Sequence, residues 1–221
     1  MIIVPSKRPE RWARVEAMAR AQTVREPLVF IGDDYTTIGA ARNAGLDRAR
    51  QETFAYFWDD DNYYGPRYIE TMRAGFASGA SVVSQGIAFV RFDDGLYLFD
   101  TRRAGSFYPG HCTAVRVADA APFPESSGWE DVEWSKRMQA RGAAVAWAAP
   151  WHAVYDRRGT DHVCGLSRVE FLRCFGGALK VSGPGVPRDC YVDVPREVIG
   201  TRVTASDDEI FAALRMRAGV Q

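Results

Sequence analysis

The sequence predicts an α/β fold with a mostly parallel central sheet, helices on both faces and an added antiparallel piece. Short apolar runs at residues 2–4, 28–31 and 54–58 each end in polar turn residues. Amphipathic helical patterns separate these runs, and strands that alternate with helices form parallel βαβ units. Later in the chain, an Asp-Gly pair between two apolar runs indicates an antiparallel hairpin.

The first half of the chain supplies the parallel units in order. Helical patterns begin at Pro9, near Ile38 and near Pro66, directly after the three apolar runs. Proline is favoured in the first turn of a helix, which supports two of these starts. Ligands of such sheets bind beyond the carboxyl ends of the strands. The acidic clusters of this sequence lie at those ends.

The second half departs from this alternation. Residues 81–92 and 96–99 flank the Asp93-Asp94-Gly95 turn and are expected to pair antiparallel. Residues 102–128 contain Gly and Pro and are expected to be irregular. A helix over residues 129–141 ends at Gly142, and an apolar strand is expected to follow at 143–148.

Composition excludes several classes of protein. The 221 residues carry 28 Lys and Arg against 28 Asp and Glu, so no basic field is available to hold a polyanion. The four cysteines form no C-x-x-C pair, which argues against a zinc knuckle or a thioredoxin-like site. We see no leader peptide and no apolar run of about 20 residues, so we expect a cytoplasmic protein without an integral membrane segment.

The first chemical candidate is the run Asp59-Asp60-Asp61-Asn62 after the third apolar run. Two carboxylates at positions i and i+2 of a strand end can approach one hard cation, which keeps open positions for phosphate oxygens. Asp59 and Asp61 are therefore candidate ligands of Mn²⁺ or Mg²⁺. A solvated acidic turn is the alternative explanation.

The second candidate is the pair Glu130-Asp131 at the start of a predicted helix. A carboxylate there can act as a general base toward a hydroxyl group. The alternative is purely structural, because Ser127-x-x-Glu130 has the spacing of a capping box and acidic residues favour helix N-termini.

Three further sets of residues complete the candidates. Asp33 and Asp34 follow the second apolar run and could bind a base or ribose, whereas Arg42 could meet a phosphate. His152 could complete a metal site of mixed carboxylate and imidazole ligands, with His162 competing for that role, and His111 is a candidate for the acceptor side. Turn formation, a surface arginine and ordinary polar packing are the alternatives. Aromatic residues could form a platform for a sugar or a base, although core packing explains most of them: Phe107, Tyr108, Trp129, Trp134, Trp147 and Trp151.

Together and in this order, these segments resemble glycosyltransferase family 2 and its GT-A relatives. Pro5-Ser6-Lys7-Arg8-Pro9 resembles the end of the family's first strand, and Phe57-Trp58-Asp59-Asp60-Asp61 resembles its F-L-D-x-D motif. Residues 39–45, Gly39-Ala-Ala-Arg42-Asn43-Ala-Gly45, resemble the family's A-R-N-x-G helix, and residues 128–134 resemble its E-D helix. The resemblance covers about residues 1–155.

This resemblance implies a GT-A, Rossmann-like fold that binds a nucleotide sugar, with UDP as the expected carrier. Asp59 and Asp61 would bind the metal and the diphosphate, and Asp131 would be the base of an inverting transfer. The nucleotide would be framed by Pro5, Ser6, Arg8, Asp33 or Asp34, and Asp60. The acceptor stays open between a glycan, a small metabolite, a protein and a modified nucleobase in DNA. We expect residues 1–175 to form the domain, with 1–100 as its nucleotide-sugar half and 101–175 as its acceptor and catalytic half, and residues 176–221 to pack on it.

Two other functions compete with a hexosyltransferase. A nucleotidyltransferase shares the nucleotide-binding half but usually needs a Gly-rich loop after the first strand, and residues 5–9 contain no glycine. A non-catalytic nucleotide-sugar-binding domain is the other alternative. Hydrolysis of the donor in the presence of metal would separate that domain from a transferase.

Overall fold

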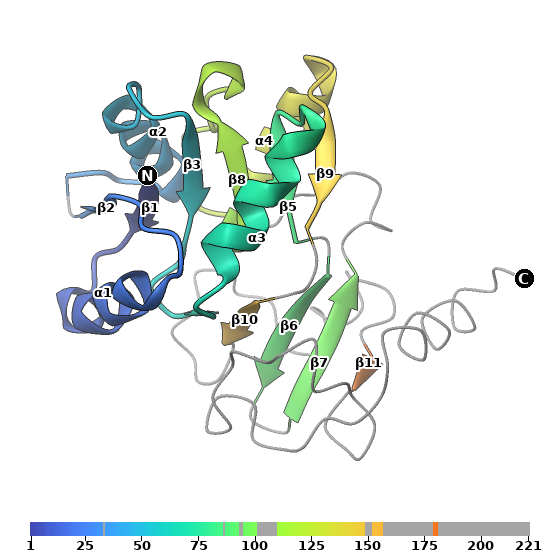
Figure 1. The fold of residues 1–221 in the computed structure, drawn as a ribbon. Helices are drawn as coiled ribbons and strands as arrows, with labels where there is room; N and C mark the ends of the chain where they lie inside the picture. The colour runs from blue at the N-terminus through green and yellow to red at the C-terminus, as the bar shows by residue number, and fades with distance from the viewer. Residues whose placement is uncertain are drawn as a thin grey trace, which may run out of the picture.

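A six-stranded sheet drawn from both halves of the chain forms the centre of the fold (Figure 1). The computed structural model describes residues 1–32, 34–85, 87–92, 95–100, 110–148, 152–156 and 179–180. In spatial order the strands are β2 (Leu28–Ile31), β1 (Ile2–Pro5), β3 (Phe54–Phe57), β8 (Thr113–Arg116), β5 (Val82–Ser84) and β9 (Val145–Trp147).

The order of these strands confirms the parallel βαβ units of the first half. β1 pairs in parallel with β2 and with β3, and β5 pairs in parallel with β9. β8 is antiparallel to both of its neighbours, β3 and β5. The expectation that residues 102–128 are irregular was therefore wrong for Thr113–Arg116, because pairing with strands distant in the sequence makes this segment a central strand.

Alternating side chains of the strands divide the apolar core between the two faces of the sheet. Ile2, Tyr56 and Trp58 pack with α1 (Trp12–Ala21) and α3 (Tyr68–Gly75). Ile3, Ala55 and Phe57 pack with α2 (Ile38–Arg48) and α4 (Glu130–Ala140). The helices thus cover both faces, as predicted. Short 3₁₀ turns flank these elements: η1 (Pro9–Arg11), η2 (Phe76–Ser78), η4 (Gly110–Cys112) and η5 (Val117–Asp119).

A second sheet lies beside the first, below it in Figure 1. Its strand order is β11 (Leu179–Lys180), β7 (Gly95–Asp100), β6 (Ile87–Phe92), β10 (Ala153–Asp156) and β4 (Tyr63–Tyr64). β6 and β7 pair antiparallel with Phe92 opposite Gly95, which confirms the predicted hairpin. The hairpin belongs to this second sheet, whereas residues 82–84 belong to the first, so the expected strand over 81–92 is two strands.

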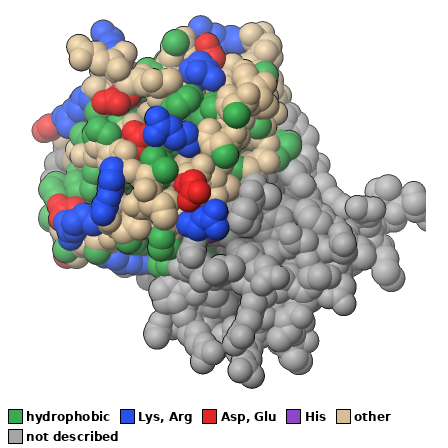
Figure 2. Space-filling view, viewed as in Figure 1, with side chains coloured by type: hydrophobic (Ala, Val, Ile, Leu, Met, Phe, Trp, Pro, Cys, Tyr) green, Lys and Arg blue, Asp and Glu red, His purple; other side chains and the backbone are tan. Residues whose placement is uncertain are grey.

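The surface gives no sign of a broad field of one charge on the face shown in Figure 2. Lys and Arg side chains alternate there with Asp and Glu side chains across the part that the structure describes. Among the described residues, no helix has the length and apolar character to cross a bilayer.

Candidate functional site

The candidate site lies where β1 and β3 end side by side. Ser6 directly follows β1, and Asp59 to Asp61 follow β3 after the buried Trp58. Ser6 Oγ donates a hydrogen bond to Asp60 Oδ2 at 2.5 Å, and Trp12 Nε1 donates to Ser6 Oγ at 3.1 Å. The parallel pairing of β1 with β3 is what places Ser6 against the acidic turn.

Two arginines from the segment after β1 also meet this turn. Arg8 donates from Nε to Asp60 Oδ2 at 3.0 Å and from Nη2 to Asp60 Oδ1 and to Asp61 Oδ2, the last at 3.1 Å. Arg11 Nη1 lies 3.7 Å from both Asp60 Oδ1 and Asp61 Oδ2. Asp60 is only 1% exposed. It therefore holds Ser6 and Arg8 in place and does not face solvent, whereas Arg8 and Arg11 remain partly exposed.

The other two carboxylates of the turn are more accessible. The side chains of Asp59 and Asp61 are 32% and 15% exposed. Burial raises the pKa of Asp61, the nearby Asp59 raises it further, and Arg8 opposes both effects. Burial also raises the pKa of Asp59, with Arg42 opposing. Glu130 and Asp60 also raise the pKa of Asp59, so this end of the sheet gathers negative charge that a cation would offset.

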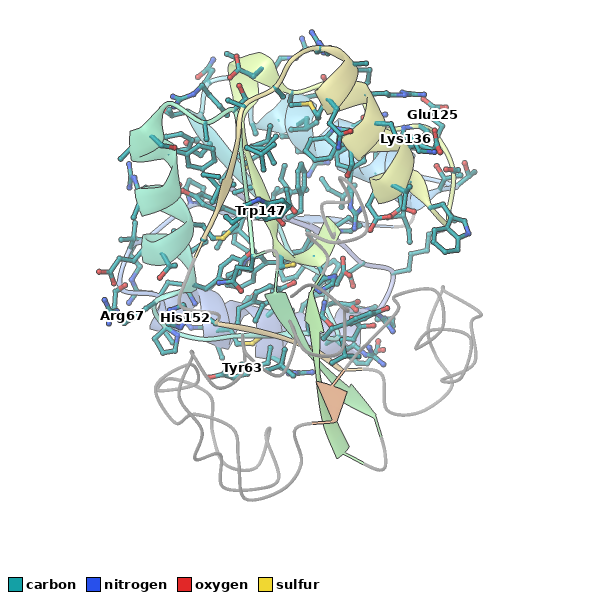
Figure 3. The ribbon with its side chains drawn as sticks, turned by 90° about the vertical axis from the view of Figure 1, so that its right-hand side faces the viewer. Tyr63, Arg67, Glu125, Lys136, Trp147 and His152 are labelled. Carbon is teal, nitrogen blue, oxygen red and sulfur yellow. The ribbon has the colours of Figure 1, made fainter. Side chains whose placement is uncertain are left out.

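The role of Asp59 and Asp61 as metal ligands stays a prediction. Within the described part of the chain, no three His, Cys, Asp or Glu side chains are grouped to hold a metal. His152 is buried, its backbone N–H donates to Gln85 Oε1 at 3.2 Å, and its carbonyl accepts from Gly65. Figure 3 shows it beside Tyr63 and Arg67. The structure does not bring His152 into a three-ligand group with the two aspartates, and His162 lies outside the described residues.

A buried ion pair joins the turn after β3 to the start of α4. Arg42, in the middle of α2, donates from Nη1 to Glu130 Oε1 at 2.8 Å and from Nη2 to Asp59 Oδ1 at 3.3 Å. The Arg42 side chain is 4% exposed and that of Glu130 is 8% exposed. A guanidinium buried between two carboxylates is not presented to a phosphate from solvent. Its geometry is that of a group that positions Asp59 and Glu130.

Asp131 is held by backbone donors on two sides. Gly110 N–H donates to Oδ2 at 3.1 Å, and Val132 N–H donates to Oδ1 at 2.9 Å. Burial, and after it the neighbouring Glu130, raise the pKa of Asp131 to about 6, while Arg42 and the two N–H donors oppose the rise. A carboxylate with this pKa takes up and releases a proton near neutral pH.

The predicted capping box at Ser127 and Glu130 is wrong. α4 has Trp129 at its N-cap, without a side-chain capping bond. Ser127 Oγ instead accepts the Ile38 N–H at 3.1 Å, and Glu130 Oε2 accepts the Gly128 N–H at 3.0 Å. Left-handed backbone angles at Gly128 (φ 134°) and Trp129 (φ 61°) turn the chain between these contacts. Ser127 therefore caps a helix that is distant in the sequence.

The loop before α4 closes the N-terminus of α2. The first three N–H groups of α2 donate to Ser127 Oγ, to the Ser126 carbonyl at 3.0 Å and to Thr37 Oγ1 at 3.1 Å. These N–H groups are therefore engaged within the chain and not offered to a phosphate.

α2 is docked to the segment before α4 by residues that the sequence prediction did not assign. Asn43 donates from Nδ2 to the Phe123 carbonyl at 3.0 Å, and its Oδ1 accepts the Phe123 N–H at 2.7 Å. A Cβ on Gly39 would lie 1.7 Å from the Pro124 carbonyl oxygen, so only glycine permits this approach. Both residues lie in the G-A-A-R-N-A-G run of residues 39–45. The run was recognised in the sequence, but its contact with residues 123 and 124 could not be predicted from it.

Tyr64 is a further residue that the sequence did not indicate. Its Oη accepts the Asp59 N–H at 2.8 Å and donates to the His111 carbonyl at 2.9 Å. The buried His111 ring lies 4.6 Å from Tyr155, and burial lowers its pKa to about 3, so the ring is neutral at physiological pH. Tyr64 thus ties the acidic turn to η4.

The remaining predicted residues lie around this edge. Pro5 ends β1 beside Ile31 of β2, and Asp34 is exposed beyond β2. Asp33 lies outside the described residues. The roles of Pro5, Ser6, Arg8, Asp34 and Asp60 toward a nucleotide stay predictions.

Comparison with known proteins bears on the fold. No protein-family model matches the sequence, and no match was found among curated proteins. Residues 1–349 of the S. aureus glycosyltransferase TarS, in complex with UDP-GlcNAc, match with a TM-score of 0.58 and 13% identity, over 75% of this chain and 60% of that chain. Another crystal structure of S. aureus TarS matches with a TM-score of 0.55 and 15% identity, over 78% of this chain and 38% of that chain.

The fold is that of GT-A glycosyltransferases. This chain spans about 60% or less of the TarS chains that it matches. At such low identity, the likeness shows the arrangement of the sheet and helices, and it does not transfer a substrate or a site residue.

Proposed function

We propose that this chain is a glycosyltransferase, of the hexosyltransferase type, that moves a sugar from a nucleoside-diphosphate sugar to an acceptor hydroxyl with inversion. The observation that carries the proposal is the Asp131 carboxylate, which the Gly110 and Val132 N–H groups hold at the start of α4 and whose pKa burial raises to about 6. The Glu130–Arg42–Asp59 ion pairs connect that helix start with the acidic turn. Such a transfer requires a general base for the acceptor hydroxyl and a site for the donor diphosphate, and the acidic turn would supply the second.

The fold supports the donor half of the proposal. TarS was crystallised with UDP-GlcNAc, so a matching fold supports a UDP-sugar as the donor class. Ser6, Arg8 and Asp34 follow β1 and β2 at the carboxyl edge of the sheet, where ligands of such folds bind. The partly exposed Arg8 and Arg11 supply positive charge for a diphosphate there.

The chemistry assigned to Asp131 is a proton transfer. The acceptor oxygen forms a bond to the anomeric carbon from the side opposite the diphosphate, and the bond from that carbon to the diphosphate oxygen breaks. The hydroxyl proton passes to the Asp131 carboxylate, which must be ionised beforehand. The N–H groups of Gly110 and Val132 keep the carboxylate oriented during this step.

Asp59 and Asp61 are the residues that would hold Mn²⁺ or Mg²⁺. When bound, the cation supplies positive charge that stabilises the leaving diphosphate. The chain's own contribution is to fix the two carboxylates: Tyr64 and Arg42 hold Asp59, and Arg8 holds Asp61. Arg42 and Asp60 act in this proposal as positioning residues.

A thermal-shift panel tests the proposal. Wild type and Asp61→Ala are heated with UDP, GDP and their sugars, each with Mn²⁺ and with EDTA, and turnover is read as nucleotide released. A ligand at 100 times its dissociation constant adds about 2.7 kcal/mol to the free energy of unfolding. We expect stabilisation by one nucleotide that needs Mn²⁺ and is lost in Asp61→Ala. The proposal fails if no nucleotide or nucleotide sugar shifts the wild type under any condition.

A further inference from the structure

Trp129 combines a strained backbone with an exposed indole. Its φ of 61° and ψ of 11° are left-handed, and it is the one non-glycine residue with positive φ among those described. Such angles are costly for a bulky residue, and strain of this kind clusters at functional sites. The side chain is 53% exposed, whereas Trp134 on the same helix is 1% exposed and packs in the core.

The turn at Trp129 is held by hydrogen bonds that do not involve the indole side chain. Glu130 Oε2 accepts the Gly128 N–H, and the Trp129 carbonyl accepts the Glu133 N–H at 3.0 Å, so backbone and Glu130 hold the turn together. Glycine would adopt the same angles without strain. Because half of the indole faces solvent, its burial does not account for its presence. An exposed indole at this position is available to a ligand.

The position of Trp129 in the sequence bears on which ligand would fit there. It directly precedes Glu130 and Asp131, the residues that the proposed transfer uses. A partner at this place must present a hydroxyl to Asp131 and a flat apolar face to the indole. A pyranose ring has both features, since its axial C–H groups pack on aromatic rings and its hydroxyls lie around the rim.

We propose that Trp129 is the stacking surface for the pyranose ring of a sugar acceptor, and that this ring brings a hydroxyl to Asp131. The inference rests on the proposed function and narrows its acceptor to a glycoside or glycan. The exposed Trp147 provides a matched control, because it is 40% exposed at the end of β9, which is the last strand of the six-stranded sheet (Figure 1).

Binding of simple glycosides without donor tests the inference. The probes are p-nitrophenyl β-glucoside, β-galactoside and β-N-acetylglucosaminide, followed by saturation-transfer NMR. The proteins are wild type, Trp129→Gly, Trp129→Phe and Trp147→Ala. We expect at least one glycoside to bind the wild type, about tenfold weaker binding in Trp129→Gly, and partial recovery in Trp129→Phe. The melting temperature of Trp129→Gly should equal or exceed that of the wild type, because the substitution relieves strain.

Three results would overturn the inference: no probe binds the wild type, Trp129→Gly binds the probes as the wild type does, or Trp147→Ala loses binding equally. UDP-GlcNAc binding is measured on the same samples. If glycosides bind through Trp129 while no nucleotide sugar binds, the glycosyltransferase proposal fails and the sugar contact stands. If nucleotide sugars bind and glycosides do not, the reverse holds.

Discussion

Arg42 Nη1 and Glu130 Oε1 lie 2.8 Å apart in the interior, joining the middle of α2 to the first residue of α4. Removing one partner leaves the other charge buried, which costs about 3–5 kcal/mol. We therefore expect Arg42→Met to lower the free energy of urea unfolding by that amount and the double variant Arg42→Met, Glu130→Gln to recover much of it. The exposed pair Arg20–Glu16 is the control, and Arg20→Ala should cost no more than about 0.5 kcal/mol. If Arg42→Met and Arg20→Ala lowered the free energy of unfolding equally, Arg42 and Glu130 would not be a buried ion pair.

The pH dependence of turnover follows from Asp131. The base must be ionised, and its pKa is raised to about 6, so turnover should rise about tenfold per pH unit below 6 and level off above it. Asp131→Asn should lower turnover by about 10²–10⁴-fold. Asp47→Asn, on an exposed part of α2, should leave the turnover rate and its pH dependence unchanged. A rate that is flat from pH 4.5 to 8 would rule out Asp131 as the base.

Asp131 also makes the free energy of unfolding depend on pH, and this free energy falls as the pH rises whereas turnover increases. The folded-state pKa of Asp131, about 6, exceeds its ordinary value of 3.8, so the native state binds this proton more tightly than the unfolded state does. The stabilisation is present below about pH 4 and is lost as the pH rises to 6. Its size is at most about 3 kcal/mol. Urea unfolding at pH 4.5 and pH 7 should therefore show a smaller loss of stability with rising pH in Asp131→Asn than in the wild type.

The docking of α2 to the loop before α4 is testable at Asn43. Asn43→Ala removes both bonds to the backbone of Phe123, and one buried backbone group left unpaired costs about 1–3 kcal/mol. Asn43→Asp keeps the acceptor for the Phe123 N–H and should retain more activity. We expect turnover to fall more than nucleotide-sugar affinity in Asn43→Ala, because the loop leads directly into Glu130 and Asp131 at the start of α4. Equal falls in both quantities would mean that the contact serves only general stability.

Metal dependence follows from the repulsion between Asp59 and Asp61. We expect Mn²⁺ to bind the wild type in isothermal titration calorimetry and to bind Asp61→Asn at least tenfold more weakly, since one of two carboxylate ligands is lost. EDTA should abolish the thermal shift that UDP-GlcNAc produces. Asp47→Asn again serves as the control for a lost surface charge. A UDP-GlcNAc shift that is equal in EDTA and Mn²⁺ would show that this donor binds without the cation.

Local patterns were sufficient to predict much of the fold. The strand Leu28–Ile31 has the predicted bounds, and α2 begins at the predicted Ile38. In both cases the apolar spacing and the flanking residues lie within the element itself. The same holds for the hairpin, whose two apolar runs lie next to each other in the sequence and pair with Phe92 opposite Gly95. The acidic turn and the Glu130-Asp131 pair were located for the same reason, as each follows or starts a predicted element.

What could not be predicted depends on contacts distant in the sequence. Thr113–Arg116 became a central strand because β3 and β5 flank it. Ser127 has a local capping partner in the sequence, yet it bonds Ile38, 89 positions away. Arg42 carries a charge that suggested a phosphate, and its burial against Glu130 could not be read from its own neighbours in the sequence. In each case, the local pattern was present and a tertiary partner outweighed it.

The short strand β11 joins residues beyond the expected domain boundary to the second sheet. Leu179 and Lys180 pair with Leu98 and Tyr97 of β7. A chain cut at residue 175, the expected domain boundary, would lose this pairing and leave the outer side of β7 as an open edge. Unpaired edge N–H and C=O groups recruit strands from other molecules. Expression trials that stop before residue 180 are therefore expected to yield aggregating material, even though the proposed site residues are all present.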